Sequence, residues 1–214
     1  MFDDRREAGK QLAEALIDYK DKDVVVLAIP RGGVEVGYQV AKALDADFSL
    51  VVVRKLPFPD NPEAGFGAIA EDGSTVILKH AGYRLLRNTV ERVIDFQREE
   101  VRRRVEVLRG GEPLPNLAGK IVILVDDGIA MGSTMRAAIK LCRNAGAGRI
   151  VVAVPVAGVR TAQGIGDLVD ELVVLETPPF FRAVAQVYRN WRDVSDQEVV
   201  SIMDVWRREE RGGD

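Results

Sequence analysis

The chain has 214 residues, 47% of them hydrophobic, so it can bury one substantial core, or one core and a small appendage. Its formal net charge of −3 gives no global electrostatic reason to expect nucleic acid or an anionic membrane as a partner. The single cysteine excludes an internal disulfide framework. The opening MFDDRREAGK is too charged for a secretory signal, and no apolar run approaches the roughly 20 residues that span a bilayer. We therefore expect a soluble, cytoplasmic protein in which any anion-binding site is local.

The first part of the chain alternates between helix and strand patterns. Apolar residues at helical spacing predict an amphipathic helix in REAGKQLAEALIDYK (6–20). The unbroken β-branched run VVVLAI (24–29) predicts a strand that is buried on both faces. The segment PRGG interrupts the pattern, and VEVGYQVAKAL (34–44) predicts the next helix.

A second buried strand leads into a different kind of segment. FSLVVV (48–53) predicts this strand, which ends in Arg54 and Lys55. Residues 56–67 are rich in proline and glycine and have no periodicity, so they predict a long loop. Long loops within compact domains are often functional.

The next segment breaks the alternation further. GAIAEDGSTVIL predicts two strands around a turn at Asp72-Gly73. Residues 81–109 predict a long surface helix or a helix pair, in which REEVRRRVEVLR alternates charge sign as a solvated, ion-paired helix does. The sole histidine, His80, is expected at the surface here. We expect residues 57–115 to form an excursion over one end of the sheet.

Alternation resumes after this excursion. Strands are predicted at 121–125, 150–156 and 171–176, and helices at 133–145, about 159–168 and after the capping box Ser195–Glu198. This order predicts an α/β fold with a mainly parallel, helix-flanked open sheet. We expect residues 1–214 to be a single domain, with the excursion as a hood.

The stretch ILVDDGIAMGST (123–134) combines two opposite binding properties. Small residues before a helix let an anion approach backbone amides, and Ser133 or Thr134 can cap that helix. Asp126 and Asp127 repel anions, but they accept hydrogen bonds from hydroxyl groups or hold a divalent ion. Ligands bind at the carboxyl ends of parallel strands. A ligand with a phosphate on one side and a diol on the other, such as a ribose 5-phosphate, satisfies both halves.

A second anion site is predicted at AIPRGGVEVG (28–37). It repeats the order of strand, glycine loop and helix, and it adds the cation Arg31. Arg54 and Lys55 are expected to reach the same rim. Two anion sites beside a diol site indicate a sugar that is phosphorylated at both ends.

These motifs resemble those of the type I phosphoribosyltransferases. IVILVDDGIAMGST resembles the signature of that family, and PRGG resembles its pyrophosphate loop. The resemblance covers nearly the whole chain: FDDRREAGKQLAEAL, VRKLPFPDNPEAGFGAIA and FRAVAQVYRNWRDVSDQEV are similar to a microbial branch of the family. The pattern departs at Gly128, where an aliphatic residue is usual, and at Ala130 and Met131, where threonines are frequent.

The resemblance implies roles for individual residues. Asp126 and Asp127 would hold the ribose hydroxyls of phosphoribosyl pyrophosphate and, indirectly, Mg²⁺. The 5-phosphate would bind Ala130, Met131, Gly132, Ser133 and Thr134. The pyrophosphate would bind Arg31, Gly32, Gly33, Arg54 and Lys55. Catalysis would rest on Asp126, Asp127, Arg31 and Lys55. A non-proline cis peptide is expected near Arg31.

The implied reaction is magnesium-dependent transfer of the phosphoribosyl group to a nitrogen acceptor, commonly a nucleobase, with release of pyrophosphate. Such a pentosyl transfer, carried out by a glycosyltransferase of nucleotide metabolism, needs water to be excluded. Residues 56–67 are the candidate lid, with Gly65 and Gly67 as hinges. The resemblance also implies a homodimer.

Other functions stay open to different degrees. A non-catalytic sensor that binds phosphoribosyl pyrophosphate would use the same site. A dinucleotide-binding dehydrogenase and a P-loop NTPase are disfavoured, because neither G-x-G-x-x-G nor G-x-x-x-x-G-K-[ST] occurs. Aromatic residues near the end of the chain either stack on a base or pin the tail to the sheet: Phe180, Phe181, Tyr188 and Trp191.

Overall fold

A computed structural model describes residues 1–78 and 85–211, so His80 lies outside the described residues. Its main sheet has five parallel strands in the order β2-β1-β6-β7-β8, which confirms the predicted fold class. The strands are β1 Val24–Ala28, β2 Asp47–Leu50, β6 Ile121–Val125, β7 Arg149–Val156 and β8 Glu171–Glu176.

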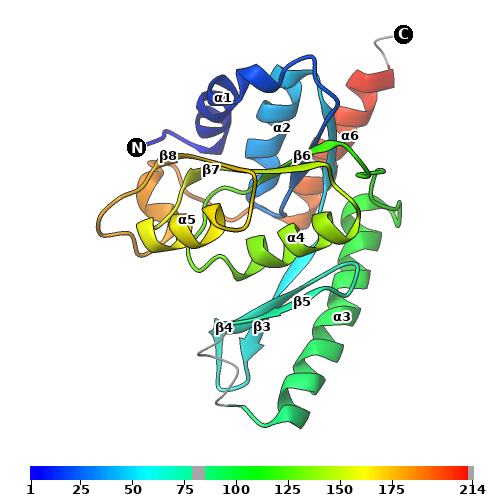
Figure 1. Cartoon of the computed structure of the whole chain (residues 1–214), viewed down its shortest axis with the longest axis vertical. Helices are drawn as coiled ribbons and strands as arrows, with labels where there is room; N and C mark the ends of the chain where they lie inside the picture. The colour runs from blue at the N-terminus through cyan, green and yellow to red at the C-terminus, as the bar shows by residue number, and fades with distance from the viewer. Residues whose placement is uncertain (79–84, 212–214) are drawn as a thin grey trace.

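Helices cover both faces of this sheet (Figure 1). On one face lie α1 Arg5–Ala15, α2 Gly33–Leu44 and α6 Asp196–Arg211; on the other lie α4 Ser133–Asn144 and α5 Val159–Gly166. Because successive side chains of a strand point to opposite faces, Val24 and Val26 join the first core, while Val25 and Leu27 join the second. The short 3₁₀ helices within residues 1–78 and 85–211 are η1 Ile17–Tyr19 and η3 Val184–Val187.

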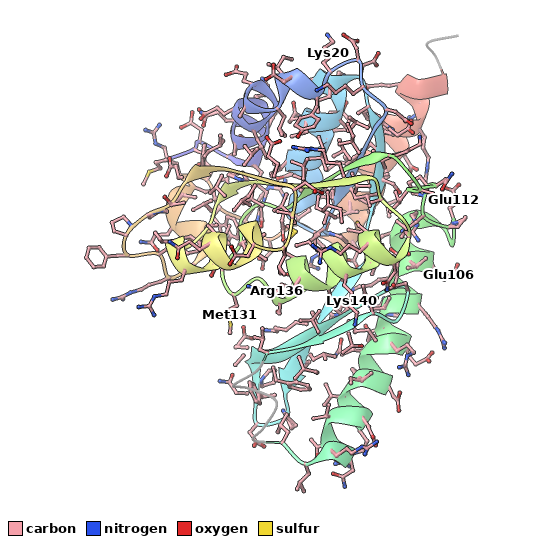
Figure 2. All side chains as sticks on the ribbon, in the orientation of Figure 1. Lys20, Glu106, Glu112, Met131, Arg136 and Lys140 are labelled. Atoms are coloured by element: carbon pink, nitrogen blue, oxygen red, sulfur yellow. The ribbon has the colours of Figure 1, made fainter. Side chains whose placement is uncertain are left out.

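The excursion forms a small antiparallel sheet and one long helix, here called the hood. Its elements are β3 Val53–Phe58, β4 Asn61–Ala70, β5 Thr75–Ile77 and α3 Arg87–Arg109. Figure 1 shows this unit extending from the body beside α4. Figure 2 shows Lys140 of α4 beside the small sheet, where its Nζ donates to the Thr75 carbonyl oxygen at 3.2 Å.

Two predictions in the hood were wrong. The parallel strand β2 ends at Leu50, and residues 53–58 pair instead with β4 in the small sheet. Residues 56–67 are therefore mostly hairpin strand rather than loop. Gly65 and Gly67 lie within β4 and permit close packing, since a Cβ on Gly67 would lie 2.1 Å from the Val76 carbonyl oxygen. The predicted turn at Asp72-Gly73 is confirmed between β4 and β5.

The ends of the helices mostly follow the sequence signals. The Ser195 hydroxyl accepts from the Glu198 amide at 3.2 Å, and the Ser195 amide donates to the Glu198 carboxylate at 2.8 Å, so the capping box is confirmed. On α3, Arg102 and Arg103 pair with glutamates three residues earlier, as expected for a solvated face. No helix within the described residues is long and apolar enough to cross a membrane.

Candidate functional site

The two sequence motifs meet at the carboxyl edge of the main sheet. Strands β1 and β6 are neighbours, with Ala28 opposite Val125, so the loop after each strand lies beside the other. A Cβ on Gly33 would lie 2.9 Å from the Asp126 Cα, and a Cβ on Gly32 only 1.8 Å from Asp127 Oδ2. The Pro30–Arg31 peptide bond is cis, as predicted. The glycines of PRGG are therefore needed for close approach to the acidic pair.

Gly32→Ala is expected to destabilise the protein by about 1–3 kcal/mol, the usual cost of overpacking, because the new methyl group would displace the Asp127 carboxylate. Thermal unfolding measures the effect. Gly166→Ala is the matched control, since its Cβ would make only an ordinary contact 3.6 Å from Leu172. Equal melting temperatures for the two variants would show that the Gly32 contact is relaxed in solution.

Two helices begin at this edge without a side-chain cap. The N-cap of α2 is Gly32 and that of α4 is Gly132, whose φ is 76°, and neither makes a side-chain capping bond. The prediction that Ser133 or Thr134 caps α4 was wrong, because both residues lie inside its first turn. The first amides of α4 and the Gly33 amide of α2 are thus available donors with positive partial charge, whereas the Val34 amide donates to the Arg31 carbonyl oxygen at 3.2 Å. This arrangement suits anions at two places on one rim.

A cavity of about 280 Å³ lies between the hood and the α4 loop. Its walls are Lys55, Glu63, Gly65, Asp126, Gly128, Ile129, Ala130, Met131, Gly132, Ser133, Thr134 and Val184. Figure 2 shows Met131 at the tip of that loop, pointing away from the main sheet, and 61% of its surface is exposed. The residues predicted to hold a 5-phosphate thus surround one space with the Asp126 carboxylate.

Arg54 and Lys55 were predicted to reach the rim of the PRGG loop together, but their side chains point in different directions. They are consecutive in β3 and so point to opposite faces of the small sheet. Lys55 lines the cavity, and its Nζ donates to the Glu63 carbonyl oxygen at 2.6 Å. Arg54 instead donates from Nε to Gln97 Oε1 at 3.1 Å, on the face covered by α3.

Arg31 and Asp127 also lie outside the cavity wall. The Arg31 guanidinium is 3.5 Å from Asp196 Oδ1 at the start of α6. Asp127 Oδ2 accepts from Arg5 Nε at 2.8 Å. Of the acidic pair, Asp126 therefore faces the cavity, while Asp127 lies between PRGG and Arg5.

Arg5 is a site residue that our sequence analysis missed. It is 4% exposed, and its guanidinium lies 3.9 Å from the centre of the Trp191 ring. Nη1 also donates to the Arg192 carbonyl oxygen at 2.8 Å. The sequence did indicate that Arg5 is buried: it precedes Ala8 and Leu12 at helical spacing, so it belongs to the apolar face of α1.

A larger groove of about 870 Å³ lies beyond Arg5, between α1, α2, α6 and residues 189–192. Its walls carry acids and bases together, including Glu35 and Arg192, whose side chains pair at 2.6 Å. The start of α4 and Asp126 do not line it, whereas both line the smaller cavity. We therefore place the candidate site in the smaller cavity.

Burial governs the charge state of the acidic pair. Desolvation, followed by the charge of Asp127, raises the pKa of Asp126 well above its ordinary value. Desolvation also raises the pKa of Asp127, and Arg5 partly offsets it. Asp126 Oδ1 accepts from the Asp127 amide at 2.8 Å. Asp126 is thus the acid whose charge is least compensated, and it is the one that faces the cavity.

The unusual Gly128 has a steric cause. A Cβ there would lie 2.7 Å from methyl groups of both Val156 and Val184. Of the aromatic residues weighed above, Tyr188 is buried and its hydroxyl donates to the Asp127 carbonyl oxygen at 2.7 Å. Tyr188 and Trp191 therefore anchor the C-terminal segment to the rest of the protein, whereas the side chain of Phe180 is 82% exposed.

Two acidic residues line the cavity, Asp126 and Glu63. The described residues contain no group of three or more His, Cys, Asp or Glu placed to hold a metal ion. Magnesium commonly binds through one or two carboxylates together with substrate phosphates. The Asp126 carboxylate in the cavity fits that mode.

The phosphoribosyltransferase class is defined by a parallel sheet with a hood, an acidic pair after one strand, and glycine loops that start two helices. The family model of the phosphoribosyl transferase domain matches residues 3–189, and the chain belongs to this family. It is 44% identical over 211 residues to proteins of two Mycobacterium tuberculosis strains, which carry the provisional name phosphoribosyl transferase. The match covers 98% of this chain and 48% of theirs, so the chain spans about half the length of these curated relatives.

The chain shares its fold with a solved structure. TT1426 from Thermus thermophilus is 39% identical, with a TM-score of 0.81, over 96% of this chain and 98% of that one. This similarity supports the same fold along nearly the whole chain. A hypoxanthine phosphoribosyltransferase from Staphylococcus aureus is 14% identical, with a TM-score of 0.49, over 83% of this chain and 74% of that one. The second similarity is too remote to bear on the acceptor.

Proposed function

We propose that the protein transfers the phosphoribosyl group of phosphoribosyl pyrophosphate to a nitrogen of a small acceptor, in the class of nucleobases, and releases pyrophosphate. The observation that carries the proposal is the cavity in which Asp126 faces the uncapped start of α4. The amides there, with Ser133 and Thr134, would bind the 5-phosphate. The ribose hydroxyls would donate to Asp126 and Asp127.

Bond changes in this reaction match the charges at the site. The bond from C1 to the pyrophosphate oxygen breaks, and the acceptor nitrogen donates its lone pair to C1. Positive charge builds on the sugar and negative charge on the leaving group. Asp126 and Asp127 would stabilise the former, and Lys55 and Arg31 the latter. A nucleophilic side chain is not required, but exclusion of water is.

Magnesium is proposed as the cofactor, held indirectly through Asp126 and Asp127. When bound, it would offset the negative charge of the pyrophosphate. The chain's own cations would act on the same charge: Lys55 from the hood and Arg31 from the loop before α2. The hood would also shield the sugar, because Glu63 and Gly65 of its hairpin form part of the cavity wall.

The test is turnover with a panel of acceptors. The protein is incubated with phosphoribosyl pyrophosphate, magnesium and individual purine and pyrimidine bases, and pyrophosphate release is followed. We expect release with at least one base. Measurable binding of phosphoribosyl pyrophosphate without release for any acceptor would overturn the proposal and favour a non-catalytic sensor.

Three further expectations belong to the same proposal. Residues 1–214 would act as one phosphoribosyltransferase unit, with the hood selecting the acceptor. The protein would form a homodimer, which light scattering tests. It would act in the cytoplasm.

A further inference from the structure

A cluster of arginines lies outside the cavity, where three elements meet Asp196 of α6. Arg31 comes from the loop before α2 and lies 3.5 Å from Asp196 Oδ1. Arg54 comes from β3 and bonds to Gln97 of α3. Arg104 comes from α3 itself, and both Arg31 and Arg54 are near enough to act on its charge.

Arg104 belongs to the inner face of α3. It follows Gln97 and Val101 and precedes Leu108 at helical spacing, and all three of those side chains are buried. Its Nε is buried and has no hydrogen-bond partner among the described residues. Asp196 Oδ1 is also buried and accepts no hydrogen bond from the part of the chain that the structure describes. Buried donors normally have acceptors, so the Nε of Arg104 is the atom that an anion would satisfy.

The charges of the cluster do not balance. Arg54 and Arg31 both bring positive charge to Arg104, and Asp196 is the nearby aspartate that offsets it. Glu100 is also near, but its carboxylate bonds to Arg103 at 3.1 Å. Burial, followed by the charge of Arg54, lowers the pKa of Arg104, which Asp196 only partly offsets. An added anion would relieve this excess of positive charge.

We propose that Arg104 binds the pyrophosphate of phosphoribosyl pyrophosphate together with Arg31 and Arg54. In the unliganded protein, Asp196 forms an ion pair with Arg31, and the bound pyrophosphate replaces Asp196 as the partner of Arg31. The inference rests on the proposed function and adds a hood residue and a C-terminal acid to it. Asp196 lies on α6, beyond the residues 3–189 matched by the family model.

Pyrophosphate is the anion that fits the position. Arg31 immediately precedes the uncapped start of α2, so guanidinium groups and backbone amides would bind one ligand from two sides. The guanidinium fork suits phosphate oxygens in a bidentate arrangement. The Arg31 side chain is 40% exposed, which gives a dissolved anion access to the cluster.

Calorimetric titration of the whole protein with magnesium and inorganic pyrophosphate tests the inference. Arg104→Gln is expected to weaken binding about tenfold or more, the loss of a charged hydrogen-bonding group. Arg104→Lys keeps the charge but loses the fork, so its affinity should be intermediate. Asp196→Asn should bind about two- to fivefold more tightly, because an ion pair that competes for Arg31 is removed. Arg102→Gln is the matched control on the exposed face, where Arg102 pairs with Glu99.

A purely structural role would give a different pattern. Thermal unfolding should show that Arg104→Gln is no less stable than the wild type, because the folded protein disfavours this charge. Unchanged pyrophosphate affinity in Arg104→Gln, or weaker affinity in Asp196→Asn, would overturn the inference, as would a wild type that does not bind pyrophosphate. The acceptor panel tests the proposed function separately. If the wild type shows turnover but Arg104→Gln binds pyrophosphate as tightly as the wild type, only the inference about Arg104 is wrong. If Arg104→Gln binds pyrophosphate more weakly but no acceptor supports turnover, only the proposed transferase activity is wrong.

Discussion

Asp126→Asn is expected to lower kcat/KM for phosphoribosyl transfer by about 10²–10³-fold, the loss typical of one preorganised charged group at a reacting centre. Asparagine retains an oxygen that can accept from the Asp127 amide, so the local backbone should survive. It lacks the charge that would stabilise the cationic sugar. Steady-state kinetics with the acceptor found in the panel measure the effect.

The same substitution should raise the stability of the unliganded protein. The pKa of Asp126 is raised in the folded state, so the folded protein holds its proton at pH values where the unfolded chain has released it. Stability is therefore lost as pH rises from the unfolded pKa through the folded one. Asp126→Asn removes that loss, so its advantage in melting temperature should be small near pH 4 and larger near pH 7.

Asp167 provides a control for both measurements, because it is an exposed acid at the end of α5. Asp167→Asn should leave kinetics and melting temperature unchanged. Full activity of Asp126→Asn would show that the Asp126 carboxylate is not needed for catalysis. A lower melting temperature at neutral pH would show that its charge is better compensated in solution than burial indicates.

Strands of the main sheet could be predicted from sequence because both of their faces are buried. Continuous apolar runs such as VVVLA and IVILV have few other stable environments in a chain with helical segments between them. The hood hairpin was missed for the opposite reason. Pro57 stands at a register shift between β3 and β4, and Gly65 and Gly67 are required by packing across strands. Proline and glycine mark loops and irregular strands alike, so composition alone could not separate them.

Motifs of the site could be predicted because each is local: the acidic pair follows one strand, and PRGG follows another. The contact partners of each side chain at the site could not be predicted from the sequence. Asp126 and Asp127 are consecutive, yet one faces the cavity and the other faces Arg5, more than a hundred residues away in sequence. Arg104 was expected on a solvated helix face, and only the packing of α3 against β3 and α6 places it inside.

Arg5 links these observations, because it keeps the carboxylate of Asp127 beside PRGG without lining the cavity itself. Its partners come from two distant parts of the chain: Asp127 after β6, and Trp191 and the Arg192 carbonyl group in the tail. A charge this deeply buried is stable only while its partners are present. Arg5 is therefore a positioning residue for the acidic pair, and its loss should affect folding as well as substrate binding.

Arg5→Gln is expected to destabilise the protein by about 3–5 kcal/mol, the usual cost of leaving one partner of a buried ion pair uncompensated. For a chain of this size each kcal/mol corresponds to roughly 2–4 °C, so thermal unfolding should show a large decrease in melting temperature. Arg6→Gln is the matched control, because Arg6 is the exposed neighbour on the same helix.

Asp127→Asn in the Arg5→Gln background should restore part of the stability, since it removes the uncompensated charge. The coupling energy from this double-mutant cycle isolates the pair from the packing of Arg5 on Trp191. Additive effects of the two substitutions would mean that the ion pair is not formed in solution. In that case Arg5 would contribute to stability only through its contact with the Trp191 ring and the Arg192 carbonyl group.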